Sequence, residues 1–205
     1  MRKMLTTGCA VAAAMAVAAC AEGGSNGSAP IQPSTTTVTA TRPMVVSVPP
    51  APAQTGAGKP VRFDPCVELS DDLVVKAGFD PASRERDAGE VVTDSLTVIG
   101  CSFSRISVED RNITGFAAVT SRNLQLAQIR ASQSITILNA DPINARPALL
   151  YSERELPGSC RAAIETTDGT FDVTLTAVPG PVTVPAPCDQ IREVATIFAA
   201  ALGDK

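Results

Sequence analysis

The sequence predicts an α+β domain in which helices near both ends of the chain pack against an antiparallel β-sheet. Three observations predict this fold. Helix-capping patterns stand between residues 61 and 81, short β-branched runs fill residues 96 to 178, and a regular helical pattern closes the chain. Hydrophobic residues make up 44% of the 205 residues and aromatic residues only 3%, so the core is expected to be aliphatic.

Two short helices are expected at the start of the domain. Asp64 is suited to cap a helix that has Pro65 at its first position, where the missing N–H costs nothing. Ser70 begins a second helix and Gly78 ends it. Phe79-Asp80-Pro81 repeats the first capping pattern, and we interpret it as a third cap rather than as a repeat architecture.

The central part of the chain favours strands. The expected strands are 96–108, 113–121, 135–138, 148–152, 160–165 and 170–178, with one short helix expected over 123–131. Thr167-Asp168-Gly169 lies between the last two runs, and Asp-Gly in such a place indicates a hairpin.

The last helix has the most regular pattern. Over residues 188–202 the apolar positions follow a 3.6-residue period: Ile191, Val194, Ala195, Phe198, Ala201 and Leu202. Gly203 ends the helix. Helices at both ends with strands between them suggest a sheet that is covered on one face.

The first 19 residues have the composition of an export signal. Arg2 and Lys3 precede an uncharged run over residues 4–19, which is short for a bilayer span of roughly 20 apolar residues. The run ends in Val17-Ala18-Ala19-Cys20, which resembles a bacterial lipobox. The resemblance implies that Cys20 carries a diacylglyceryl anchor and becomes the first residue of the mature chain.

The alternative cleavage site and the position of Cys9 also concern this leader. An ordinary signal peptide cut after Ala16-Val17-Ala18 is the alternative to the lipobox. Cys9 has Thr6 three residues before it, where a lipobox needs an aliphatic residue, so we place Cys9 in the discarded leader. Residues 20–60 are rich in Thr, Pro and Gly and are expected to form a disordered tether, which leaves residues 61–205 as one globular domain.

Four cysteines remain in the expected domain: Cys66, Cys101, Cys160 and Cys188. An even number in an oxidising compartment implies two disulfides, for which three connectivities exist. We expect Cys66–Cys101 and Cys160–Cys188, because each would join a terminal helix to a nearby strand through a short loop. A zinc site of four thiolates is the alternative, although the chain has no C-x-x-C pair. No metal and no cofactor is expected.

The composition of the chain argues against several classes of function. The chain has no histidine, so a catalytic triad with a histidine base is absent in its usual form. The net charge is −4, and without Arg2 and Lys3 it is −6, from 15 basic and 21 acidic residues. That balance argues against nucleic acid as a partner, because a phosphate backbone requires a basic surface.

A group of short segments resembles a known family. Phe63–Cys66, Leu69-Ser70, Ala77–Pro81 and Gly100–Phe103 look like the actinobacterial lipoprotein family called domain of unknown function 3558 (DUF3558). In that family a tryptophan is common where this chain has Phe103. The resemblance implies a cell-envelope lipoprotein without an assigned function, and it supplies no catalytic residue to carry over.

We therefore expect a non-catalytic binding module, lipid-anchored on the extracytoplasmic face of the cell membrane. Its partner would be an envelope protein, a cell-wall component or an apolar small molecule such as a lipid. The alternative is an envelope hydrolase that uses a carboxylate pair. Its candidate acids are Asp71-Asp72, Glu109-Asp110, and Glu153 with Glu155. Each group also has a simpler structural reading, in a helix first turn, a turn or a solvated strand end.

Overall fold

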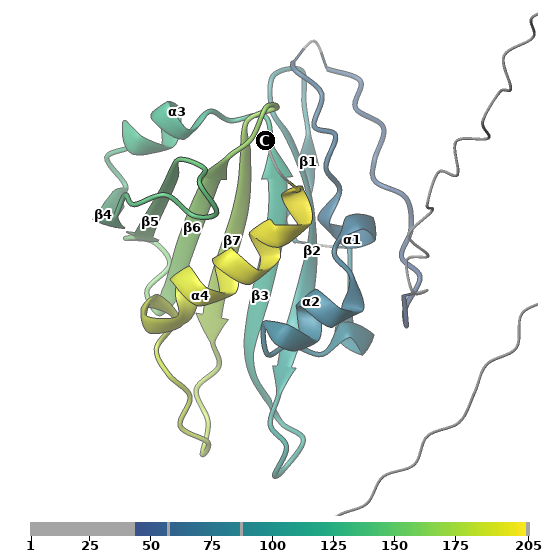
Figure 1. Ribbon diagram of the computed structural model, residues 1–205, viewed down its shortest axis with the longest axis vertical. Helices are drawn as coiled ribbons and strands as arrows, with labels where there is room; N and C mark the ends of the chain where they lie inside the picture. The colour runs from purple at the N-terminus through teal and green to yellow at the C-terminus, as the bar shows by residue number, and fades with distance from the viewer. Residues whose placement is uncertain (1–43, 57, 87, 204–205) are drawn as a thin grey trace, which may run out of the picture. The chain divides into compact units, whose positions relative to one another are not determined.

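A computed structural model describes residues 44–56, 58–86 and 88–203, within the compact unit formed by residues 40–205. The described residues form a seven-stranded sheet in the order β1-β2-β3-β7-β6-β5-β4, in which every neighbouring pair is antiparallel (Figure 1). The strands are β1 (Val91–Val92), β2 (Thr97–Ile106), β3 (Ile113–Arg122), β4 (Ile135–Asn139), β5 (Ala148–Glu153), β6 (Ser159–Glu165) and β7 (Thr170–Ala177). The predicted α+β class is confirmed, and only β1, a pair of residues, was not expected.

The short N-terminal helices begin at the predicted caps. They are α1 (Pro65–Glu68), α2 (Asp71–Lys76) and the 3-10 turn η1 (Pro81–Ser83). The Asp64 carboxylate accepts from the Cys66 N–H at 3.0 Å, and the Ser70 hydroxyl accepts from the Leu73 N–H at 3.4 Å. Each cap supplies a side-chain acceptor to an amide in the first turn of its helix.

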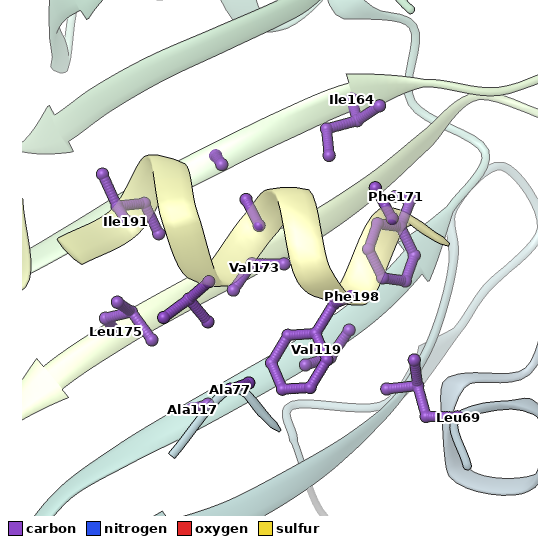
Figure 2. Packing of buried hydrophobic residues seen from close by; sticks show 14 of the residues in the cluster. Leu69, Ala77, Ala117, Val119, Ile164, Phe171, Val173, Leu175, Ile191 and Phe198 are labelled. Carbon is purple, nitrogen blue, oxygen red and sulfur yellow. The ribbon is translucent and has the colours of Figure 1, made fainter. Parts of the chain in front are cut away.

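The C-terminal helix lies across one face of the sheet. Helix α4 (Pro187–Ala199) continues into the 3-10 turn η2 (Ala200–Leu202), and Gly203 ends it with φ 66°. Its apolar side packs on β6 and β7, and Figure 2 shows Ile191 and Phe198 of this side within the main core. The Phe198 ring lies 6.2 Å from Phe79 and 6.1 Å from Phe103, and so joins the α2 end of the core to the sheet.

The sheet is also covered on its other face, which the sequence did not lead us to expect. Helix α3 (Leu126–Arg130) packs Leu126 and Ile129 on Leu149, Tyr151 and Ala163. Successive side chains of a strand point to opposite faces, so these β5 and β6 residues face away from α4. The continuous buried run at the start of β5 reflects this two-sided burial.

Both expected disulfides are present. Cys66–Cys101 joins α1 to β2, and Cys160–Cys188 joins β6 to α4, with Cα–Cα distances of 4.9 and 5.0 Å. The four sulfur atoms are therefore bonded in pairs and are not free thiolates for the alternative zinc site.

Residues 44–56 and 58–60 contain no helix or strand but contact the domain. The Val45 N–H donates to Asp71 at 2.7 Å, and Arg86 Nε donates to the Pro49 carbonyl at 2.6 Å. Val48 packs against the main core. The described part of the segment that composition assigned to the tether thus lies on the domain. Cys9 and Cys20 lie outside the described residues. Among the residues that the structure describes, no helix is long and apolar enough to cross a membrane.

Candidate functional site

A cavity with a volume of about 590 Å³ lies beside the β6–β7 hairpin. We call it the hairpin pocket. It is lined by Val61, Arg62, Phe63, Glu68, Ser121, Arg146, Glu165, Thr166, Thr167, Asp168 and Leu202. Segments from both ends of the domain therefore meet at this pocket, since the end of α4 lies at the same end of the sheet as the hairpin (Figure 1).

The hairpin requires the glycine that the sequence pattern singled out. The Thr166 N–H donates to the Gly169 carbonyl at 2.9 Å and closes the turn. Gly169 has φ 152°, and a Cβ placed there would lie 2.2 Å from the Arg122 carbonyl oxygen. A residue with a side chain would push the hairpin away from the end of β3, so glycine sets the position of this pocket wall.

Asp168 joins the hairpin to the segment before α1. Its side chain is buried, and Oδ2 accepts from the Arg62 N–H at 3.2 Å. The other oxygen, Oδ1, makes no hydrogen bond within the described residues and lies 3.9 Å from Arg62 Nε. Lys59 Nζ donates to the Thr167 carbonyl and adds a second connection. One carboxylate oxygen thus holds a backbone amide, while the other is ion-paired with Arg62 without a hydrogen bond.

Arg146 enters the pocket from the turn before β5. Asn144 and Ala145 have φ 47° and 61°, a left-handed pair that reverses the chain. Arg146 is 6% exposed, and its Nη2 donates to the carbonyl oxygens of Leu202 at 3.4 Å and Gly203 at 3.1 Å. A cation is favourable at a helix C-terminus, where the carbonyl oxygens lack partners.

Two other polar side chains in the pocket have no hydrogen-bond partner among the residues that the structure describes. Ser121, near the end of β3, is 3% exposed, and its Oγ makes no hydrogen bond within the described residues. Glu165 is half-buried at the end of β6, and its carboxylate likewise has no ion pair or hydrogen bond there. A buried hydroxyl without a partner is costly, so native proteins rarely keep one without a reason.

The apolar part of the pocket comes from Val61, Phe63 and Leu202. The Phe63 ring meets Phe171 edge-on at 5.5 Å, which holds it on the main core. Glu68, although it also lines the pocket, accepts from the Asp64 N–H at 2.7 Å and closes the α1 turn. The pocket therefore combines an apolar wall with buried polar groups.

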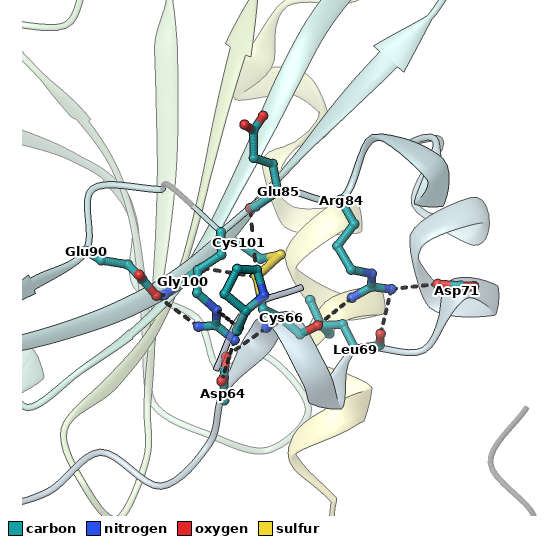
Figure 3. The surroundings of a disulfide bond; sticks show 11 residues. Asp64, Cys66, Leu69, Asp71, Arg84, Glu85, Glu90, Gly100 and Cys101 are labelled. Carbon is teal, nitrogen blue, oxygen red and sulfur yellow. Dashed lines mark hydrogen bonds and ion pairs between the residues drawn. A yellow bond between two sulfur atoms is a disulfide. The ribbon is translucent and has the colours of Figure 1, made fainter. Parts of the chain in front are cut away.

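The first disulfide is surrounded by a polar network (Figure 3). Arg84 is buried, and it donates to the carbonyl oxygens of Cys66 at 3.1 Å and Leu69 at 2.9 Å and to Asp71 at 2.7 Å. A Cβ on Gly100 would lie 2.5 Å from the Thr120 side chain, so a larger residue would disturb the β2–β3 pairing. The residues that carry the family resemblance thus build the fold next to the pocket wall.

A family model described as "Protein of unknown function (DUF3558)" matches residues 15–200. The chain belongs to the DUF3558 family. Neither a curated protein nor a solved structure matches the chain. The DUF3558 match covers both disulfides, all seven strands, the whole of α4 and every residue of the hairpin pocket except Leu202.

The acid pairs that the sequence suggested for catalysis have other partners in this DUF3558 domain. Asp71 holds Arg84 at the start of α2, and Glu153 pairs with Arg161 at 3.0 Å. Asp110 lies in the β2–β3 turn, where it accepts from the Asn112 N–H at 3.1 Å. That bond, helped by side-chain bonds, lowers the pKa of Asp110. None of the suggested acids lines the hairpin pocket.

A buried charged cluster on the α3 face was not predicted. Arg122 binds Asp172 through two hydrogen bonds of 2.6 and 2.5 Å, and its Nη2 also donates to the Tyr151 hydroxyl at 3.1 Å. Burial alone would lower the pKa of Arg122, but the charge of Asp172 outweighs it and the pKa is raised. Burial, reinforced by the charge of Asp172, raises the pKa of Tyr151. In the sequence of β7, the polar residues Thr170 and Asp172 alternate with apolar residues, and this pattern could have predicted a polar cluster on the α3 face.

Proposed function

We propose that this DUF3558 protein is an extracytoplasmic lipoprotein, anchored through Cys20, whose domain is a non-catalytic module that binds a small ligand in the hairpin pocket. The hairpin pocket is the observation that carries the proposal. Ligand sites commonly measure roughly 300–1,000 Å³ and combine apolar walls with a few polar groups. The pocket, at about 590 Å³, has that size and that composition.

The pocket is supported by rigid parts of the fold. Cys66–Cys101 fixes the α1 side, and Cys160–Cys188 fixes α4, whose end carries Leu202. A preformed site loses less entropy when a ligand binds than a site that must be ordered first. The covalent link beside the α1 wall of the pocket therefore favours binding.

A non-catalytic role agrees with the use of the pocket's acids. Asp168 holds a backbone amide with one oxygen, and Glu68 caps α1. With no histidine in the chain, a histidine general base is also absent. The pocket has the groups to hold a ligand, and two of its three carboxylates already support the backbone.

The pocket itself favours a second candidate, a hydrolase with a carboxylate pair, because Glu165 and Asp168 both line it. Glycosidases place two carboxyl groups on either side of the scissile bond. Release of aryl alcohol from synthetic aryl glycosides by the full chain, lost in Glu165→Gln and kept in Glu155→Gln, would support the hydrolase. Equal release by all three proteins, or none, would reject it.

Binding is tested by native mass spectrometry of the full chain purified from its own host. We expect a co-purified small molecule as added mass. A Leu202→Trp variant should lose this mass, because the indole fills the pocket. The control is Leu156→Trp at an exposed turn, which should retain it. Absence of added mass from the unmodified chain, or equal mass in both variants, would contradict binding in the pocket.

The anchor is tested by detergent-phase partitioning. Cys20→Ser should leave an unlipidated precursor and remove the mass of the diacylglyceryl group. Cys9→Ser should retain lipidation, because Cys9 lies in the expected leader. A lipid mass that persists in Cys20→Ser would overturn the proposed anchor.

A further inference from the structure

We infer that the hairpin pocket binds a carboxylate joined to an apolar body, and that Arg146 holds the carboxylate. The inference rests on the proposed binding role of the pocket and adds the chemical class of the ligand. It follows from the burial of Arg146, from the hydrogen bonds of its guanidinium, and from the partners of the charged residues around it.

Arg146 is a buried cation without a counter-charge among the described residues. Arg84, 3% exposed, and Arg146, 6% exposed, are the buried arginines of this part of the chain. Arg84 forms an ion pair with Asp71 at 2.7 Å, whereas no carboxylate of the described residues forms one with Arg146. An unpaired buried charge lowers stability, so a ligand that supplies the missing negative charge is favoured.

The guanidinium of Arg146 has donors without an acceptor. Its Nη2 donates to the carbonyl oxygens of Leu202 and Gly203, and within the described residues the side chain makes no other hydrogen bond. A guanidinium has five N–H donors, so those of Nε and Nη1 are left for a ligand. Carbonyl oxygens at a helix end carry roughly half a unit of negative charge, which leaves part of the arginine charge uncompensated. A carboxylate supplies the acceptors and the remaining charge, and it fits the planar fork of the guanidinium.

The guanidinium lies on the face of the sheet that carries α4. At this end of the sheet, Ser121, Phe171, Ile164 and Ala148 form one row of paired residues across β3, β7, β6 and β5. The last three belong to the core under α4. Arg146 comes two residues before Ala148, and its bonds to the end of η2 place its guanidinium on this same face. Arg146 therefore shares a face with the apolar residues of the pocket.

The other charged residues that line the pocket have different partners or point elsewhere. Arg62 is ion-paired with Asp168 at 3.9 Å and also donates its backbone N–H to that carboxylate. Glu68 accepts from a backbone N–H at the α1 cap. Glu165 is the neighbour of a core residue in β6, so its side chain leaves the strand toward the α3 face. Arg146 is thus the lining cation that has no ion pair in the described structure.

Apolar residues beside Arg146 give the ligand its second part. Leu202, whose carbonyl oxygen accepts from Arg146, also lines the pocket. Phe63 packs edge-on against Phe171 at 5.5 Å, and Val61 is buried. A hydrocarbon group placed against these residues is removed from water, which favours binding. One unpaired cation and a volume of about 590 Å³ suit a small monocarboxylate.

The experiment compares three probes of equal carbon number: hexanoate, hexanamide and hexylammonium. The full chain in phosphatidylcholine nanodiscs is titrated by calorimetry, with empty nanodiscs subtracted. Hexanoate should bind roughly tenfold more tightly than hexanamide, because a hydrogen bond between charged groups is stronger than one to a neutral amide. Hexylammonium should bind least, since it brings a second cation to Arg146. Equal or tighter binding of hexanamide or hexylammonium, or no binding of hexanoate, would overturn the carboxylate assignment.

Substitutions of Arg146 test whether it holds the carboxylate. Arg146→Gln keeps an amide donor but removes the charge, so it should weaken hexanoate roughly tenfold and leave hexanamide nearly unchanged. Arg146→Lys keeps the charge and a donor for the carbonyl oxygens at the end of η2. It loses the planar fork and should weaken hexanoate several-fold. Arg154→Gln, at an exposed position in the β5–β6 turn, is the control and should change neither probe.

Hexanoate binding that is unaltered in both Arg146 variants would overturn the assignment. If Arg146→Gln weakens both probes alike, the pocket itself has changed, and the Arg146→Lys comparison decides. The co-purified mass described above tests whether the pocket binds a small molecule at all. The three probes test only the chemical class of that molecule, so the two proposals fail separately.

Discussion

At the scale of single residues, the pocket and the core differ in whether their buried hydroxyl groups are hydrogen-bonded. In the core, Thr170 Oγ1 donates to Asp172 Oδ2 at 2.8 Å, and the bond satisfies a buried hydroxyl. In the pocket, Ser121 Oγ is buried without such a bond among the described residues. An unsatisfied buried hydroxyl lowers stability, so we interpret Ser121 as a group retained for binding rather than for folding.

Ser121→Ala should therefore stabilise the ligand-free protein. We expect a gain of about 1 kcal/mol in the free energy of unfolding, because a desolvated hydroxyl is removed without loss of a hydrogen bond. Urea unfolding followed by tyrosine fluorescence measures it. Thr170→Val, which removes a bonded hydroxyl, should instead lose about 1 kcal/mol. A loss of stability in Ser121→Ala would mean that the hydroxyl has a partner in the ligand-free protein.

Tyr151 should titrate above its ordinary pKa of 10.0, because burial disfavours the phenolate. Above pH 10 the unfolded chain releases this proton while the folded chain keeps it, so stability falls as pH rises. Tyr151 is the sole tyrosine of a chain without tryptophan, so the near-ultraviolet absorbance of phenolate reports this group alone. Tyr151→Phe should lack this component of the alkaline loss of stability. A midpoint of phenolate formation at or below pH 10 in the folded protein would contradict the prediction.

At the scale of elements, most helices and turns follow local signals. The caps at Asp64, Ser70 and Asp80 place α1, α2 and η1 where the sequence predicts them. The β6–β7 hairpin follows the predicted Asp-Gly pair, but its glycine has a second task that the sequence does not reveal. Gly169 lets the hairpin approach the backbone of Arg122.

Gly169→Ala should therefore cost more than a turn glycine ordinarily does. Gly158, in the β5–β6 turn, has φ 83° and nothing within 4 Å of an added Cβ, so Gly158→Ala is expected to cost about 1 kcal/mol from backbone strain alone. Gly169→Ala adds a backbone clash and should cost about 2 kcal/mol more. Chemical unfolding of both variants measures the difference. Equal losses in the free energy of unfolding would show that the hairpin shifts away from Arg122 without loss of stability.

At the scale of the whole molecule, the two disulfides have different consequences for the pocket. They span 35 and 28 residues, and on loop entropy each contributes about 3–4 kcal/mol. Helix α4 has thirteen residues and a buried apolar side that holds it on the sheet without the link. Helix α1 has four residues and depends far more on its disulfide.

Replacing Cys66 and Cys101 together with alanine should therefore loosen the wall formed by residues 61–68 and reduce the co-purified mass of the pocket ligand roughly tenfold or more. Replacing Cys160 and Cys188 together should reduce stability by a similar amount, about 3–4 kcal/mol, but leave binding within a few-fold. Native mass spectrometry of each variant, at a temperature below its unfolding transition, checks both. Equal losses of affinity would contradict a special role of the first disulfide.

The sequence by itself determined the α+β class, the capped helices, the β6–β7 hairpin and the disulfide pairing, because each depends on local spacing or on a small number of cysteines. Tertiary structure decided the second covered face and the pocket. Ser121, Arg146 and Glu165 stand on separate strands and turns, and no local pattern shows that they share a cavity with Leu202. Strand order and the path of α4 bring them together, and these arise from long-range packing that short sequence windows do not contain.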